Sequence, residues 1–172
     1  MKKLIIASFI VLGLSTVQAQ NVTLNVKLNP IQTLVVNNGQ TVNLEYSSKD
    51  HYKNGVTFTN NDHLNIYSTG GFQVKVKSAT ASLNNGTKNI EAKSILLTAT
   101  AGTDGITSAT YSKNVELSTA EALLVSSTIG GVNKNISVAY KGAGGDAYVN
   151  NYIAGQTATV YTTELTYTIV SQ

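Results

Sequence analysis

The chain is a series of short runs in which apolar and polar residues alternate. In one of them, Phe72, Val74 and Val76 face one way and the polar residues between them face the other. Period-two alternation predicts a strand with one buried face. We expect strands over 22–28, 31–36, 42–46, 63–67, 71–78, 94–100, 109–117, 123–127, 135–141 and 157–170.

Turn signals separate these runs, and helical periodicity is almost absent. Asn-Gly at 38–39, 54–55 and 85–86 favours tight hairpins, because both residues tolerate positive φ. Ser118 to Glu121 fits a capping box and predicts a single helical turn. About ten short strands at this spacing predict an all-β fold, an antiparallel immunoglobulin-like β-sandwich. We expect one domain over residues 20–172.

The first nineteen residues have the pattern of a signal peptide. Lys2 and Lys3 precede an apolar run over 4–14, and Val17 and Ala19 provide the small residues of a cleavage site. A run of this length is too short to cross roughly 30 Å of hydrocarbon. We therefore expect removal of residues 1–19, no transmembrane segment in the mature chain, and export to the periplasm, the cell surface or the medium.

Charge is sparse: 12% of the 172 residues are charged, about half the usual share. All twelve basic residues are Lys, against nine carboxylates, and the formal net charge is +3. Loss of Lys2 and Lys3 with the signal peptide leaves about +1. Nucleic-acid binding normally needs clustered Lys and Arg, so we exclude that class of partner. The absence of Cys excludes disulfides and thiolate sites.

The two histidines are the main candidates for chemistry. His51 and His63 each follow an aspartate, Asp50 and Asp62, which would suit a metal site or an acid–base pair. The alternative is that they are polar turn residues flanking strands. No third ligand has a typical spacing, and no Gly-x-Ser-x-Gly or phosphate-loop motif occurs. We expect no metal, no cofactor and no catalysis.

The run from 22 to 28 directly follows the predicted cleavage site. Val22, Leu24, Val26 and Leu28 alternate with polar residues, so the segment could add as a strand to the sheet of another subunit. The alternative is an ordinary first strand, paired within its own domain. We expect the second arrangement, because the segment is short and no disordered spacer follows it.

Tyrosine dominates the aromatic residues, with nine Tyr in the chain. Rings exposed on a sheet could stack on sugars, whereas a strand Tyr more often places its ring in the core and its hydroxyl at the rim. We expect the second placement. The Tyr on predicted strands are Tyr46, Tyr67, Tyr111, Tyr140, Tyr161 and Tyr167.

Two stretches resemble parts of known bacterial surface proteins. Residues 69–76 resemble the first Trp-x-Leu strand of WxL domains, and 161–169 resemble the strand that carries the second; Phe72-x-Val74 and Tyr167-x-Ile169 stand at the motif positions. Gly155 and the Tyr-Thr-rich strand after it also resemble the last strand of secreted pilin-type subunits. The resemblance implies an immunoglobulin-like sandwich displayed on, or exported past, a bacterial envelope.

These observations lead to two functional expectations. The first is an exported, non-catalytic surface or matrix structural protein, such as an adhesive or fimbria-like subunit, whose partners are itself or other surface subunits. The second is a periplasmic or secreted carbohydrate- or peptidoglycan-binding module, whose partner is cell-wall glycan. WxL domains attach non-covalently to the cell wall, which is the function that this part of the resemblance implies.

Overall fold

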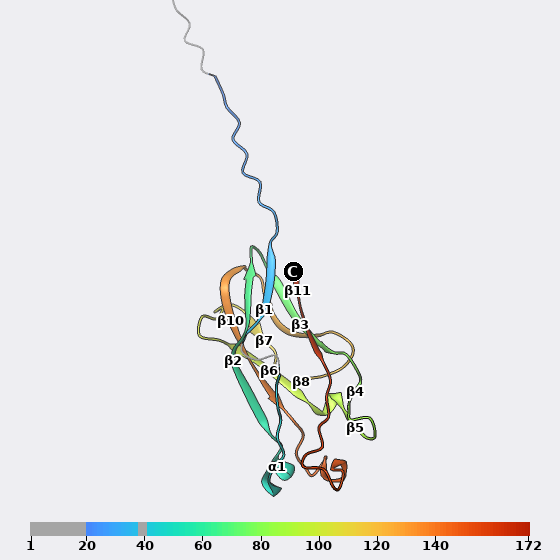
Figure 1. Cartoon of the computed structure of the whole chain (residues 1–172). Helices are drawn as coiled ribbons and strands as arrows, with labels where there is room; N and C mark the ends of the chain where they lie inside the picture. Colours follow the sequence, from blue (N-terminus) through green and yellow to red (C-terminus); the bar gives the residue numbers. More distant parts are fainter. Residues whose placement is uncertain (1–19, 38–40) are drawn as a thin grey trace, which may run out of the picture.

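The computed structural model describes residues 20–37 and 41–172, and this part of the chain is an all-β protein with antiparallel sheets (Figure 1). Its strands are β1 (Gln32–Val36), β2 (Thr57–Ser68), β3 (Phe72–Ser78), β4 (Ser82–Asn84), β5 (Asn89–Glu91), β6 (Leu96–Ala101), β7 (Thr110–Tyr111), β8 (Val115–Glu116), β9 (Ala122–Ser127), β10 (Gly131–Lys141) and β11 (Leu165–Ser171). One helix, α1 (Lys49–Asn54), and two 3-10 turns, η1 (Ala92–Ser94) and η2 (Val149–Asn151), complete it. None of these helices is long and apolar enough to cross a membrane.

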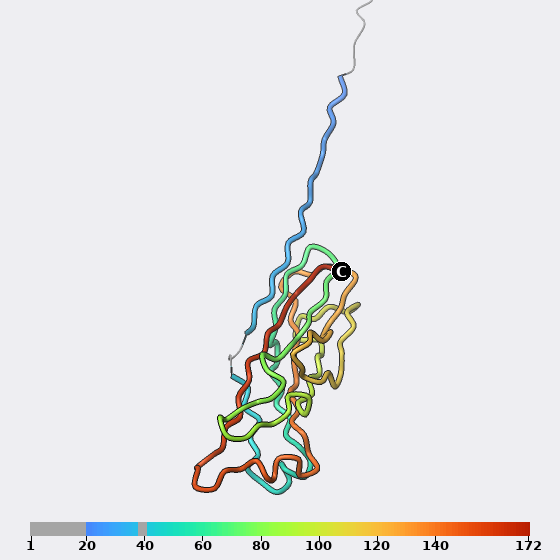
Figure 2. Tube along the Cα trace, turned by 90° about the vertical axis from the view of Figure 1, so that its right-hand side faces the viewer, coloured from blue at the N-terminus to red at the C-terminus, as the bar shows by residue number. Residues whose placement is uncertain are grey.

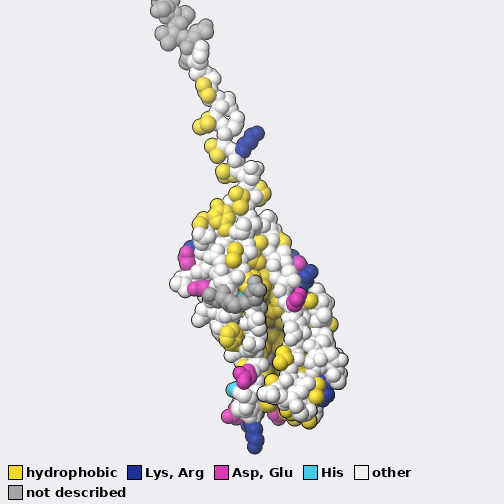
Figure 3. Space-filling model, in the orientation of Figure 1, with side chains coloured by type: hydrophobic (Ala, Val, Ile, Leu, Met, Phe, Trp, Pro, Cys, Tyr) yellow, Lys and Arg dark blue, Asp and Glu magenta, His cyan; other side chains and the backbone are white. Residues whose placement is uncertain are grey.

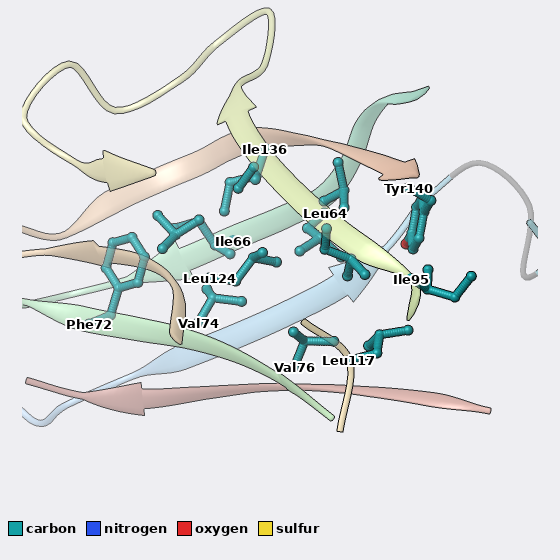
Figure 4. Close-up of a cluster of buried hydrophobic side chains, with 14 of the residues drawn as sticks. Leu64, Ile66, Phe72, Val74, Val76, Ile95, Leu117, Leu124, Ile136 and Tyr140 are labelled. Carbon is teal, nitrogen blue, oxygen red and sulfur yellow. The ribbon is translucent and has the colours of Figure 1, made fainter. Parts of the chain in front are cut away.

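The strands form two main sheets and a small hairpin. One sheet has the order β1-β2-β10-β6-β8 and the other β11-β3-β9-β7, while β4 pairs with β5. The two main sheets pack against each other, and their apolar side chains meet between them (Figure 4). Alternation explains this core, because every second residue of β3 is buried. The largest fully buried side chains are Phe72, Leu64, Ile66, Leu97 and Leu124.

Most predicted strands are present, with altered boundaries. The predictions at 31–36, 71–78, 94–100 and 123–127 correspond closely to β1, β3, β6 and β9. Those at 63–67 and 135–141 extend into the longer β2 and β10, which bond to each other. The prediction at 109–117 was wrong in length, because β7 and β8 pair with different sheets. Of 157–170, only the part from Leu165 onward forms a continuous strand.

The expectation that 22–28 pairs within its own domain was wrong. Residues 20–31 form an extended segment that leaves the body beyond β1 and points away from it in both views (Figures 1 and 2). No described strand lies beside residues 22–28, so their apolar side chains have no surface to pack against. The predicted signal peptide lies outside the described residues.

The helical prediction was also wrong. Residues 118–121 are not helical, because the Leu117 N–H and the Ser118 carbonyl already bond to Ile95 and Ser78. The helix lies instead at α1, where the Ser48 side chain accepts a hydrogen bond from the His51 N–H. Asn54-Gly55 ends this helix rather than forming a hairpin.

The remaining Asn-Gly pairs have different outcomes. Asn85-Gly86 connects β4 to β5, so the hairpin predicted there is confirmed. Asn38-Gly39 lies outside the described residues.

Candidate assembly surface

The first part of the candidate surface is the N-terminal extension, residues 20–31. Its apolar side chains are almost fully accessible: Val22 is 90% exposed, Leu24 87%, Val26 77% and Leu28 88%. The first hydrogen bonds to the body occur at Ile31, whose N–H donates to Thr69 Oγ1 and whose carbonyl accepts from the Thr69 N–H, both at 3.0 Å. Residues 20–30 therefore present free backbone groups and an unburied apolar row.

The second part lies where the two main sheets meet at their edges. β1 bonds only to β2, and β11 bonds only to β3, so each has one edge without a ladder. The two strands lie side by side (Figure 1). Near the end of β11 the Ser171 hydroxyl donates to Gln32 Oε1 at 3.2 Å. We call this boundary the seam; β1 and residues 41–46 form one side, and β11 forms the other.

Residues 41–46 continue the first side of the seam as an unpaired strand. Their burial alternates, with Val42, Leu44 and Tyr46 half-buried and the residues between them exposed. No backbone–backbone hydrogen bond joins them to another residue that the structure describes. In Figure 1 this segment runs from the end of β1 toward α1. The predicted strand at 42–46 thus has the alternation of a strand and no partner.

The seam leaves part of the core visible from outside. A strip of hydrophobic side chains runs down the middle of the molecule in Figure 3, between two mostly polar halves. The apolar residues on both sides of the seam pack against the core but are only partly buried. They are Leu34, Val42 and Leu44 on the first side, and Leu165, Tyr167 and Ile169 on the second. The seam is therefore an apolar surface with free strand edges.

A group of polar rings lies beneath the seam. The rings of Tyr140 and Tyr167 each lie 5.9 Å from that of His63, edge to face. The two Tyr hydroxyls are hydrogen-bonded to each other. Burial raises the pKa of Tyr140 to about 12 and raises the pKa of Tyr167 beyond its ordinary range. Both are neutral hydroxyls at physiological pH.

His63 is 3% exposed in this group. Its Nδ1 lies 3.0 Å from the carbonyl oxygen of Asn37, just after β1. Burial lowers the pKa of this imidazole below its ordinary value, and the contact with Asn37 acts in the opposite direction. His63 is thus a neutral ring, and its contact with Asn37 connects the end of β1 to β2.

The segments that form the two sides of the seam contain few charged residues. Residues 41–46 contain a single charged residue, Glu45, and 157–171 contain only Glu164; both are exposed. β1 has none. The N-terminal extension has one charged residue, Lys27, which is also exposed. These two carboxylates are opposite in charge to Lys27, whereas Lys75 and Lys77 of β3, which pair with Thr168 and Thr166 of β11, have the same sign.

The residues considered for metal or acid–base chemistry do not form a cluster. His51 lies in α1, where its Nδ1 accepts a hydrogen bond from the Ser47 N–H at 3.2 Å. Asp62 accepts two hydrogen bonds from Thr103, which lower the pKa of its carboxyl group. Within the described ranges, no group of three or more His, Asp or Glu side chains could hold a metal ion.

Most of the tyrosines are partly buried, and among the described residues they form no exposed row. Tyr46 contacts Tyr52 and Tyr148 with ring centroids 5.4 and 5.1 Å apart. Burial raises the pKa of Tyr46 to about 12. Of the nine Tyr, only Tyr152, at 50%, belongs to the exposed class. The expected placement of strand Tyr rings against the core is confirmed for Tyr140 and Tyr167.

Sequence reasoning found the N-terminal segment but missed the seam. The pattern at 42–46 is the same as that of paired strands, and nothing in it shows that the partner is missing. The only signal in the sequence is that the alternating runs at 22–28 and 42–46 have no evident partner strand. Comparison with known proteins finds no matching family model and no similar curated protein.

Proposed function

We propose that this chain is an exported, non-catalytic structural subunit that assembles by strand addition through its N-terminal extension. The observation that carries the proposal is the exposed alternating row Val22, Leu24, Val26 and Leu28 on an unpaired backbone. Strand addition satisfies both features at once, because backbone hydrogen bonds supply affinity and alternate side chains enter the partner's core.

The energy available from this row supports association. Full burial of one such side chain contributes about 1.5–3 kcal/mol. Four of them together are comparable with the loss of translational and rotational freedom on association, about 4–15 kcal/mol. Added backbone hydrogen bonds increase the gain. Left in water, the same row would be an aggregation liability, as is usual for an exposed apolar edge.

We propose further that the two packed sheets form an immunoglobulin-like sandwich on or beyond a bacterial envelope. The antiparallel sheets and single core support the sandwich, and the signal-peptide pattern at 1–19 supports export. The sparse charge of the strands is consistent with a surface selected to meet other subunits. A carbohydrate- or peptidoglycan-binding module is the weaker alternative, because the described residues show no exposed row of Tyr that would stack on sugars.

The test is the assembly state of the mature chain, residues 20–172. We expect sedimentation velocity and electron microscopy to show linear assemblies that grow with concentration. The double variant Leu24→Asp with Val26→Asp should remain monomeric, because charged side chains cannot enter an apolar core unpaired. A matched control, Thr23→Lys with Asn25→Lys, adds two charges on the polar face, opposite in sign to Glu45 and Glu164, and should still assemble.

Two results would overturn the proposal. One is a wild-type chain that stays monomeric at every concentration and is absent from the cell-surface fraction. The other is equal assembly by the two double variants, since this would show that the apolar row plays no part.

A further inference from the structure

We propose that the seam is the binding site for residues 22–28 of a second copy of this chain. The inference rests on the proposed function and names the surface that accepts the added strand. The described part of the molecule has other strand edges, at β7, at β8 and in the short β4–β5 hairpin, so the seam must be distinguished from these.

The seam matches the extension in length and offers free backbone groups. β11 has seven residues, the same number as 22–28. Seven residues of strand extend for roughly 23 Å. By contrast, β7 and β8 have two residues each and offer few places for a ladder. The unpaired backbone of 41–46 lengthens the first side of the seam in a way that neither β7 nor β8 matches.

The side-chain chemistry of the seam also matches that of the extension. The seam presents partly buried apolar residues from both sheets, and an added strand would bury them together with its own apolar row. Its free edges belong to β1 and β11, so a strand placed there would extend a ladder while covering the core. The partner must therefore have apolar side chains at every second position, as 22–28 does.

The charged residues of the extension and of the segments beside the seam differ in sign. Lys27 is the single charged residue of the extension, while Glu45 and Glu164 are the single charged residues of the two segments beside the seam. Opposite charges fix the register and steer the encounter more than they add affinity. Lys27 of a second copy can therefore pair with Glu45 or Glu164, although Lys75 and Lys77 of β3, beside β11, have the same sign as Lys27.

The competing occupant is the same copy's own extension, folded back on itself. Only residues 29–31 separate 22–28 from β1, and they include Pro30. The structure shows this connection extended, with the segment directed away from the body (Figure 2). The test must therefore distinguish a link between copies from a link within one.

Cysteine cross-linking makes that distinction, because the chain has no Cys of its own. Donor copies carry Thr23→Cys, Asn25→Cys or Lys27→Cys on the polar face of the extension. Acceptor copies carry the assembly-blocking Leu24→Asp and Val26→Asp, a different tag, and either Asn43→Cys or Thr166→Cys, both exposed positions beside the seam. Matched control acceptors carry Thr110→Cys on β7 or Glu116→Cys on β8, which are also exposed.

We expect oxidised mixtures to give mixed-tag dimers with the seam acceptors at least ten times more abundant than with the control acceptors. Association with links at β7 or β8 would overturn this inference and leave the proposed function standing. No association with any acceptor would overturn both. A further control is one chain that carries both Asn25→Cys and Thr166→Cys, oxidised at high dilution. A monomeric product with an internal disulfide would show that the extension binds the seam of its own copy, and would also overturn this inference.

A charge exchange gives a second readout. Lys27→Glu in donor copies should reduce the yield of mixed dimers several-fold at low salt, because it places like charges together. Glu45→Lys with Glu164→Lys in acceptor copies should restore the yield for that donor. An unchanged yield in both cases would contradict the pairing of Lys27 with Glu45 or Glu164.

Discussion

The hydroxyl pair of Tyr140 and Tyr167 joins the two sheets beneath the seam, β10 on one side and β11 on the other. Tyr140 is 3% exposed, so its hydroxyl depends on this partner. Tyr167→Phe should lower the free energy of unfolding by about 1–3 kcal/mol, the usual cost of a buried polar group left unpaired. Urea unfolding measures it.

Tyr152→Phe is the matched control for that substitution. Tyr152 is 50% exposed, and its hydroxyl donates to the Gln156 carbonyl at the surface. The control should change the free energy by less than about 0.5 kcal/mol. Equal effects of the two substitutions would show that the buried pair contributes no more than a surface hydroxyl.

His63 makes stability depend on pH. Burial lowers its pKa in the folded protein, so the unfolded chain takes up a proton more readily. The stabilisation is complete above the unfolded pKa of about 6.5 and is lost as the pH falls through the folded value. The urea concentration at the unfolding midpoint should therefore decrease as the pH is lowered from about 7.5 to about 5. His63→Gln should make that decrease smaller.

The control for this prediction is His51→Gln on α1. Since His63 remains in that variant, the difference between its urea midpoints at the two pH values should equal that of the wild type. A His63→Gln protein with the full wild-type pH dependence would show that another group is responsible.

At the scale of elements, the end of α1 depends on a glycine. Gly55 has φ +81°, and a Cβ there would lie 2.4 Å from the carbonyl oxygen of Gly142. Gly55→Ala should lower the free energy of unfolding by about 1–3 kcal/mol or more, from backbone strain and the clash with Gly142. Gly70→Ala is the control, because a Cβ at Gly70 meets nothing within 4 Å. Similar midpoints in a denaturant titration would contradict the argument.

The same scale shows what a sequence can and cannot predict. Alternation located β3, β9 and the inner half of β2, because burial of every second side chain is a local property. Pairing is a property of distant segments, so the same pattern at 22–28 and 42–46 wrongly predicted paired strands. α1 escaped prediction because none of its residues is buried and its boundaries depend on Ser48 and Gly55.

For the same reason, the sequence predicts the N-terminal extension of the candidate site but not the seam. Val22, Leu24, Val26 and Leu28 stand out in the sequence because they alternate with polar residues directly after the predicted cleavage site. The seam arises only when β1 and β11, more than a hundred residues apart in the chain, come to lie side by side. Its half-buried Leu34 and Ile169 look like ordinary core residues until the fold leaves them uncovered.

For the whole molecule, the domain should be independent of the extension. Residues 22–28 are exposed, and the first hydrogen bonds to the body occur at Ile31. Deletion of residues 20–28 should change the free energy of unfolding by less than about 0.5 kcal/mol, since it removes no folded contact. Denaturation of the deletion variant beside the monomeric Leu24→Asp and Val26→Asp variant tests this. A loss of several kcal/mol would mean that the extension packs on its own domain in solution.

The position of the extension also determines how load would pass through such an assembly. It continues without interruption into β1, whose five residues bond to β2 from Gln32–Ser68 to Val36–Leu64. A pull on the extension therefore acts along β1, and the bonds of that ladder are strained together rather than opened one after another from an end. Strands loaded lengthwise in this way resist far greater force than strands that are peeled apart. Subunits joined through this connection would form a tether suited to tension, without a single covalent cross-link between them.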